Sequence, residues 1–255
     1  MPHLTSLKAS NNLVKSVEFL SKPSVLEFLF VAEFAKNQIK SLPALTVKRL
    51  RVLDLKENLI SSCAELNGHP TLERLELRKN KLKSAEGLSK MPNLTELYLA
   101  QNELQDLTGL HDLPKLKKLH LRENKQLEKL GDVGLLPSLA YINLRDSGFK
   151  EREDVQKLIP FVGLRKISVT GTPFETEVGD VKTELLMFLQ QLTHLGKDTE
   201  EIPPEDKAAA LETLKTRRQE EEDRKREEEQ RKKDELEAQQ AKDNPQDGAG
   251  DGNDN

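Results

Sequence analysis

One motif recurs eight times along the chain and constrains the fold more than any other feature. Each copy follows the pattern Leu-x-x-Leu-x-Leu-x-x-Asn-x-Leu, with other residues at some positions in the first and last copies. Successive copies are separated by 25, 21, 22, 22, 22, 23 and 25 residues. A steady period of this length predicts stacked units in which each unit packs only on its neighbours. The copies begin at Leu4, Leu29, Leu50, Leu72, Leu94, Leu116, Leu139 and Leu164.

Apolar and polar residues alternate inside each copy, as Leu53 and Leu55 illustrate, and this alternation predicts a short β-strand with apolar side chains inward. The pattern is typical of leucine-rich repeats. We therefore predict an α/β fold, a leucine-rich-repeat solenoid of the short 22-residue class with about eight repeats. A helix closing the stack and a long charged α-helix are expected to follow it.

An asparagine recurs at the same place in each of the first six copies. A buried amide at this place is expected to bond peptide groups in the turn that leaves the strand, so a structural role is favoured over a catalytic one. Ser147 and Thr172 occupy the position in the last two copies. The asparagines are Asn12, Asn37, Asn58, Asn80, Asn102 and Asn124.

The two ends of the stack differ. After the last repeat, apolar residues between Val181 and Leu195 have the spacing of a helix that covers an open core. The first repeat begins at Leu4 with no capping helix before it, so we expect a partner or another chain to cover that edge, or upstream sequence to be missing. The expected division is solenoid and cap over 1–198, a single charged helix over 199–241, and a disordered tail over 242–255.

Charge changes at Pro203. The segment that ends there carries 29 basic and 27 acidic residues, and the segment after it carries 11 and 17. A helix is predicted from about Pro204 to Gln240, with few apolar residues for a coiled coil. Six pairs place a glutamate four residues before a base: Glu220 with Arg224, Glu221 with Lys225, Glu222 with Arg226, Glu227 with Arg231, Glu228 with Lys232, and Glu229 with Lys233. The alternative is an acidic tail that stays solvated, because helices polar on all faces are marginal.

Composition excludes several classes of function. The nearly neutral solenoid argues against nucleic-acid binding, and the absence of a long apolar run argues against a membrane protein. Cys63, the only cysteine, fits a core slot that other repeats fill with Ala85 or Leu107. A lone cysteine and the absence of a signal segment lead us to expect an intracellular, soluble protein.

Motifs that carry chemistry are lacking. The histidines lie in different repeats without metal-ligand spacing, and no glycine-rich phosphate loop is present. We therefore expect no catalytic residues, no metal, no cofactor and no small-molecule substrate. The histidines are His3, His69, His111, His120 and His194.

Recognition of another protein remains, through the exposed strand positions on the concave face. Aromatic and basic residues gather in the later repeats, with fewer acidic residues in the same columns, which favours an acidic or amphipathic partner segment. The alternative is that these charges pair with one another and contribute little. The predicted partner-binding residues are Lys56, Arg78, Tyr98, His120, Arg122, Tyr141 and Arg145.

Segments 94–102 (LTELYLAQN) and 116–124 (LKKLHLREN) make the chain similar to the leucine-rich repeat-containing protein 23 family. Residues 4–16, 34–39 and the charged stretch 205–233 resemble the same family. This chain departs from the family at two places. At its front the family has a further repeat and an acidic segment. At the cap, Asp180, Val181 and Lys182 replace a Tyr-Arg motif, and Leu195-Gly196 replaces a closing Leu-Asp.

That resemblance implies a scaffold in the radial spoke, at the spoke head, of the axoneme of a cilium or flagellum. It also implies protein partners from the spoke. Short repeat proteins related to this family include a dynein light chain, a phosphatase-one regulatory subunit and a spliceosomal scaffold. A regulatory adaptor of a dynein motor or of protein phosphatase one is therefore the alternative.

Overall fold

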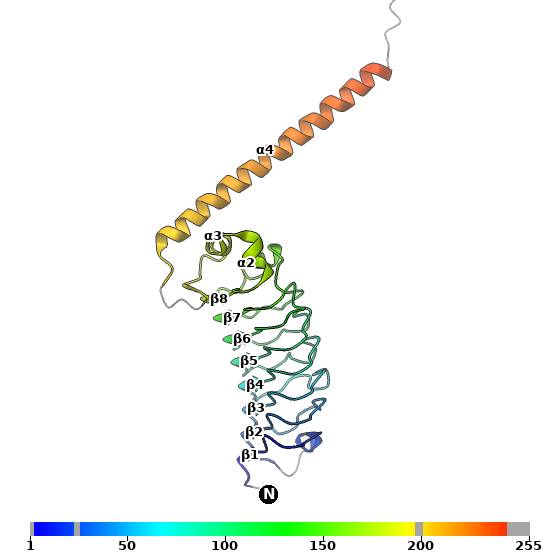
Figure 1. Cartoon of the computed structure of the whole chain (residues 1–255), viewed down its shortest axis with the longest axis vertical. Coiled ribbons are helices and arrows are strands. Elements are labelled where there is room, and N and C mark those ends of the chain that lie inside the picture. Colours follow the sequence, from blue (N-terminus) through cyan, green and yellow to red (C-terminus); the bar gives the residue numbers. More distant parts are fainter. Residues whose placement is uncertain (1–2, 23–25, 197–200, 244–255) are drawn as a thin grey trace, which may run out of the picture.

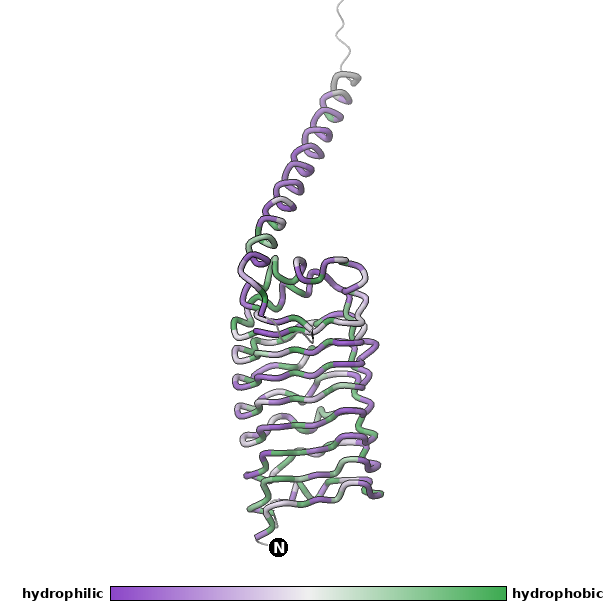
Figure 2. The backbone as a smooth tube through the Cα atoms, turned by 60° about the vertical axis from the view of Figure 1, so that its left-hand side comes forward, coloured by the Kyte–Doolittle hydropathy of each residue, from purple (hydrophilic) through white to green (hydrophobic). Residues whose placement is uncertain are grey.

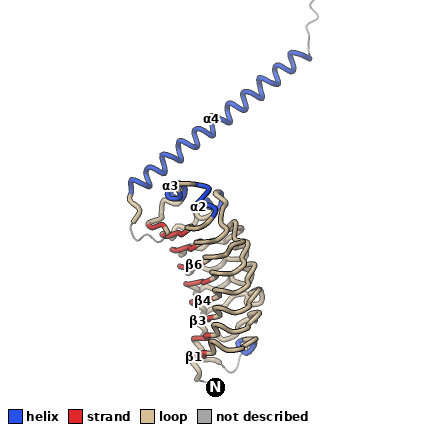
Figure 3. Tube along the Cα trace, in the orientation of Figure 1, coloured by secondary structure: helices blue, strands red, loops and turns tan. Residues whose placement is uncertain are grey.

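The repeats stack into an elongated solenoid, and a long helix extends from its far end (Figure 1). This arrangement comes from a computed structural model that describes residues 3–22, 26–196 and 201–243. Strands line one side of the stack and loops form the other (Figure 3). The predicted disordered tail, 242–255, lies almost wholly outside the described residues.

Eight three-residue strands, one for each predicted repeat, form a parallel sheet in sequence order. Each strand pairs with the next without a shift of register, so that Leu53 faces Leu75 and Leu75 faces Leu97. The predicted repeat number is thereby confirmed. The strands are β1 (Ser6–Lys8), β2 (Val31–Glu33), β3 (Val52–Asp54), β4 (Arg74–Glu76), β5 (Glu96–Tyr98), β6 (Lys118–His120), β7 (Tyr141–Asn143) and β8 (Lys166–Ser168).

The core is a column of leucines that runs the length of the stack. The central residue of each strand from β2 to β8 is buried, whereas Leu7 in β1 is only partly buried because no described repeat packs beneath it. Apolar and polar residues alternate along every turn of the solenoid (Figure 2). Two short elements lie in the loops, the 3-10 helix η1 (Glu18–Ser21) and the helix α1 (Glu153–Gln156).

The cap differs from the single helix predicted over 181–195. It consists of α2 (Pro173–Val178), α3 (Val181–Leu186) and the strand β9 (His194–Leu195). The chain leaves the helix after Leu186 because β9 joins the sheet, where the amide of Thr193 donates to the carbonyl of Arg165 at 2.8 Å. Helical spacing of leucines therefore continued into a segment whose backbone pairs with a strand.

The charged helix α4 (Pro204–Asp243) is confirmed, and its 40 residues measure about 60 Å in length. Its first turns pack on the cap, where Ala210 is buried and Arg217 pairs with Glu184 at 2.8 Å. Further along, Glu221–Lys225 and Glu228–Lys232 form as predicted. Three of the other four bases pair with different acids, namely Arg226 with Asp223, Arg231 with Glu235, and Lys233 with Glu237.

Candidate functional site

The recurrent asparagines hold the turns of the solenoid. The Asn80 amide donates to the carbonyls of Leu55 and Leu77 at 3.0 Å each, and its oxygen accepts from the amide of Ile60 at 2.9 Å. Asn37, Asn58, Asn102 and Asn124 make the same three kinds of bond. Each of these side chains thus ties its own turn to the preceding repeat.

The first and last members of this series differ. Asn12 is exposed and donates only within its own turn, to the carbonyls of Ala9 and Ser10. Ser147 and Thr172 are buried, and the Thr172 hydroxyl accepts from the amide of Glu175 and caps α2. The bonds of the buried members are therefore the structural ones that the sequence led us to expect.

Three aromatic side chains form a row across β5, β6 and β7 on the side of the sheet that faces away from the core, which we call the strand face. The rings of Tyr98 and His120 are stacked, with centroids 4.6 Å apart. Tyr141 meets His120 edge-on at 5.3 Å. We call Tyr98, His120 and Tyr141 the aromatic row, and it lies half-buried at the centre of the strand face.

Two arginines contact the first ring of the row. The guanidinium carbons of Arg74 and Arg78 lie 4.7 Å and 5.1 Å from the centre of the Tyr98 ring. Such cation–π contacts hold guanidinium groups flat against an aromatic face. Arg78 also donates twice to the buried Glu76 carboxylate, at 2.7 Å and 2.6 Å. These contacts fix the ring and both arginines in one arrangement.

Glu96 connects two cations, Arg74 and Lys118, to the aromatic row. Its carboxylate accepts from the Tyr98 hydroxyl and from the Lys118 ammonium at 2.9 Å each, and Arg74 lies at 3.4 Å. The bond from Lys118 is the main reason that the pKa of Glu96 is lowered. The pKa of Tyr98 is raised by burial and by its bond to Glu96. Glu96 is therefore an anion and Tyr98 a neutral phenol at physiological pH.

The imidazole between the two tyrosines is also neutral there. Burial lowers the pKa of His120, and the positive charge of Arg78 lowers it further. Burial raises the pKa of Tyr141 as well. The aromatic row is consequently an uncharged strip with cations along one side, which suits contact with apolar or aromatic groups.

The outer basic residues of the strand face are all paired. Lys56 contacts Glu57 at 3.3 Å, and Arg145 contacts Asp146 at 3.1 Å. Arg122 donates to Glu123. Because each of these acids follows its basic partner by one position, it lies outside the columns from which we expected few acids in the later repeats. The later half of the strand face is therefore closer to neutral than we expected from its columns.

The predicted binding residues thus fall into two groups. Arg78, Tyr98, His120 and Tyr141 lie together, whereas Lys56, Arg122 and Arg145 each pair with an acid from their own turn. Residues that the prediction left out also belong to the cluster, and their positions in the same strand columns were the available signal. They are Arg74, Glu76, Glu96 and Lys118.

Other chemistry-bearing side chains serve the core. Cys63 is buried, which raises its pKa to about 12. His69 is buried against the carbonyl of Val47 at 3.1 Å. Across the residues that the structure describes, no group of three or more His, Cys, Asp or Glu is arranged to hold a metal ion. In the same residues, no helix has the length and apolarity needed to span a bilayer.

Comparison with known proteins agrees with the fold. The family described as Leucine Rich repeats (2 copies) matches residues 70–110 and 92–135, the part of the chain that contains β4 to β6. The chain is a leucine-rich-repeat solenoid. The solved leucine-rich repeat domain of APL1 superposes with a TM-score of 0.53 at 19% identity, covering 66% of this chain and 43% of that one.

Two further similarities complete the comparison. Internalin C2 of Listeria monocytogenes superposes with a TM-score of 0.54 at 20% identity, covering 75% of this chain and 79% of that one. Leucine-rich repeat-containing protein 23 of Xenopus tropicalis is 41% identical over 96 residues, which are 37% of this chain and 27% of the relative. The resemblance predicted from the sequence is confirmed for that part of the chain, which spans about a quarter of the relative's length.

Proposed function

We propose that this chain is a non-catalytic scaffold that holds a segment of another protein on its strand face. The observation that carries the proposal is the aromatic row, which is partly exposed at the centre of a broad face. Tyrosine and arginine dominate the energetics of protein interfaces, and a solenoid presents them on an extended surface. The row supplies rigid apolar contact, and Arg74 and Lys118 supply charge at its border.

The ion pairs of the face indicate which segment fits it. Each predicted cation is paired with a carboxylate of this chain, so a purely acidic peptide would have to compete with carboxylates such as Glu76, Glu123 and Asp146. An amphipathic segment can place apolar or aromatic anchors on the row, where no carboxylate competes with them. Its acidic residues can face the partly exposed guanidinium of Arg74. We therefore assign the partner this chemistry.

We further propose that the assembly is the radial spoke of a cilium or flagellum, at the spoke head. The support is the 41% identity to leucine-rich repeat-containing protein 23, together with the charged helix that follows the repeats. In this proposal the solenoid holds the partner and the charged helix α4 reaches a second component. Partners would be other spoke proteins, and the chain would reside in the axoneme.

Crosslinking in isolated axonemes tests both parts of the proposal. The tagged chain is expressed in a flagellated cell, axonemes are extracted with salt, and crosslinked peptides are identified by mass spectrometry. We expect crosslinks from Lys118 to spoke proteins. Recovery in the soluble cell body with a phosphatase, with a dynein motor or with nuclear proteins would overturn the radial-spoke assignment.

A matched pair of variants tests the strand face itself. Replacing Tyr98, Arg122 and Tyr141 with alanine removes the ends of the row and one outer cation, and we expect loss of the crosslinks from a chain that circular dichroism shows to remain folded. The control replaces Lys81, Lys83 and Lys129, which are exposed on the turns beside the strands. Capture that survives the first triple variant would show that the partner binds elsewhere.

A further inference from the structure

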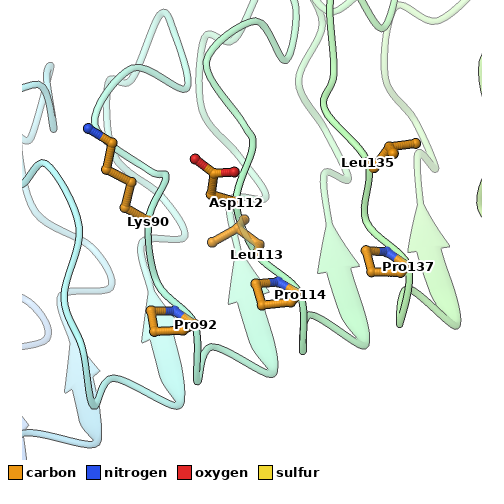
Figure 4. A pocket seen from close by; sticks show the side chains of 7 residues that line it. All are labelled: Lys90, Pro92, Asp112, Leu113, Pro114, Leu135 and Pro137. Carbon is orange, nitrogen blue, oxygen red and sulfur yellow. The ribbon is translucent and has the colours of Figure 1, made fainter.

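A second surface lies outside the strand face, on the loops that lead into the strands. A hollow of about 500 Å³ opens there across three successive repeats. Its floor is formed by one proline from each repeat, and its rim by the residue two positions earlier (Figure 4). The lining residues are Lys90, Pro92, Asp112, Leu113, Pro114, Leu135 and Pro137.

The rim residues occupy the same position in their repeats and carry an ordered chemical pattern. Along the stack they are basic, acidic and apolar: Lys90, Asp112 and Leu135. Leu135 is 69% exposed, which is unusual for a leucine of this solenoid. Lys90 makes no ion pair within the described residues, and Asp112 contacts only the exposed His111 ring at 2.9 Å. The rim is therefore available to another molecule.

The spacing of the rim suits an α-helix laid along the stack. Adjacent strands are about 4.8 Å apart, so the three rim positions span about 10 Å. On a helix, residues i, i+4 and i+8 lie on one face and span about 12 Å. The proline floor offers no backbone N–H for an added strand, which favours packing of helical side chains.

The charged helix of this chain carries the complementary pattern. Glu228, Lys232 and Leu236 lie four residues apart on one face of α4 and are acidic, basic and apolar in that order. Leu236 is 56% exposed, with charged residues around it. The Glu228–Lys232 contact of 2.7 Å is exposed, and a pair of this kind contributes little stability that docking would have to replace.

We propose that α4 of a second copy of this chain docks in this hollow. Glu228 of that copy faces Lys90, Lys232 faces Asp112, and Leu236 packs on Leu135 over the prolines. The helix of the same copy does not reach the hollow, because it leaves the cap and points away from the stack (Figure 1). The contact is independent of the strand face and leaves the aromatic row free.

The geometry makes this contact head-to-tail. Glu228 lies 24 residues beyond the start of α4, about 36 Å along the helix, so the cap of the second copy lies beyond the front of the first. The hollow and the helix are different surfaces, and joining them repeatedly produces an open array rather than a closed dimer. The expected assembly is a row of solenoids, each bracing the next with its helix.

Engineered cysteines test the docking directly. The native Cys63 is buried and its pKa is raised to about 12, so it does not compete in oxidation. A Leu135→Cys chain is mixed with a Leu236→Cys chain in mild oxidant, and we expect a disulfide-linked dimer of the two. A Leu13→Cys chain, whose leucine is 75% exposed at the front of the stack, is the matched control. Equal crosslinking with the control, or none with Leu135→Cys, overturns the proposal.

Charge reversal gives a second, independent readout in analytical ultracentrifugation. Lys90→Glu with Asp112→Lys should at least halve the associated fraction at a fixed protein concentration, and adding Glu228→Lys with Lys232→Glu should restore it. The strand-face triple variant should associate like the native chain, which separates this proposal from the binding of a partner on the aromatic row. Association that ignores the charge reversal would refute the docking.

Discussion

The rings of Tyr98 and His120 are nearly parallel, with an interplanar angle of 12° and centroids 4.6 Å apart. Tyr141 touches the same imidazole, and these are the two tyrosines of a chain that has no tryptophan. Every tyrosine signal of the protein therefore arises on the strand face. A partner that covers the aromatic row can be followed without a label.

Alkaline titration should report the bond between Tyr98 and Glu96. In a Tyr141→Phe background only Tyr98 titrates, and its pKa should lie above the ordinary value of about 10, because burial and the bond to Glu96 favour the neutral phenol. Adding Glu96→Gln should lower that pKa while leaving it raised by burial. Phenolate absorbance measures the midpoint. Glu73→Gln, at a carboxylate paired with Arg51, should leave it in place.

Removal of one buried asparagine should destabilise the stack strongly. Asn80→Ala deletes three bonds to backbone groups, and those groups stay buried without a partner. We expect a loss of roughly 3 kcal/mol in the free energy of unfolding. Asn12→Ala, at an exposed amide bonded only in its own turn, should cost less than about 1 kcal/mol. Urea unfolding measures both. Equal losses would contradict the role assigned to the bonds between repeats.

Two glycines separate backbone conformation from crowding. Gly87 has a φ of +84° and an added Cβ would lie 1.9 Å from the carbonyl oxygen of Cys63. Gly196 also has a positive φ, +57°, but its Cβ would meet only the Thr170 hydroxyl at 3.5 Å. Gly87→Ala should therefore cost about 3 kcal/mol or more, and Gly196→Ala about 1 kcal/mol. Thermal unfolding of the two variants compares the losses.

Stability should fall with pH in a window set by His69. Burial lowers the folded-state pKa of this imidazole below its ordinary value near 6.5, so the unfolded chain binds the proton more readily. The stability is present above that ordinary value and is lost as the pH falls below it. His69→Met, which copies Met91 in the next repeat, should reduce the loss between pH 7.5 and pH 5.5. His120 also has a lowered pKa but stays in both proteins, so the difference belongs to His69.

The sequence predicted the strand positions that recur with the repeat and missed the contacts that depend on side-chain conformation. The period placed Tyr98 beside His120, because a parallel stack without register shifts turns equal positions into neighbours in space. Tyr141 occupies the position opposite Lys118 in the next strand, so its contact with His120 crosses from one column to another. The same rule predicted the slot that buries Cys63. It did not show that Arg74 and Arg78 bracket the Tyr98 ring, since side-chain torsions decide that contact.

Two other predictions failed for physical reasons that a pattern does not carry. Leucine spacing predicted one cap helix up to Leu195, but the end of that segment is the strand β9, which pairs with β8. On α4, Arg226 and Arg231 chose Asp223 and Glu235 over the predicted glutamates, because several exposed acids lie within reach of each base. Local competition of this kind changes the partner without changing the helix.

Because β1 through β8 pair without a shift of register, the length of the stack is set in equal steps of one repeat. Each repeat adds one strand spacing, about 4.8 Å, between the front edge and the cap. Loss or gain of one whole repeat would therefore change the reach from the front edge to the root of α4 in a fixed step, with the columns of the strand face still aligned. The number of repeats therefore sets the distance from the front edge to the root of α4, and the surfaces at the two ends do not depend on that number.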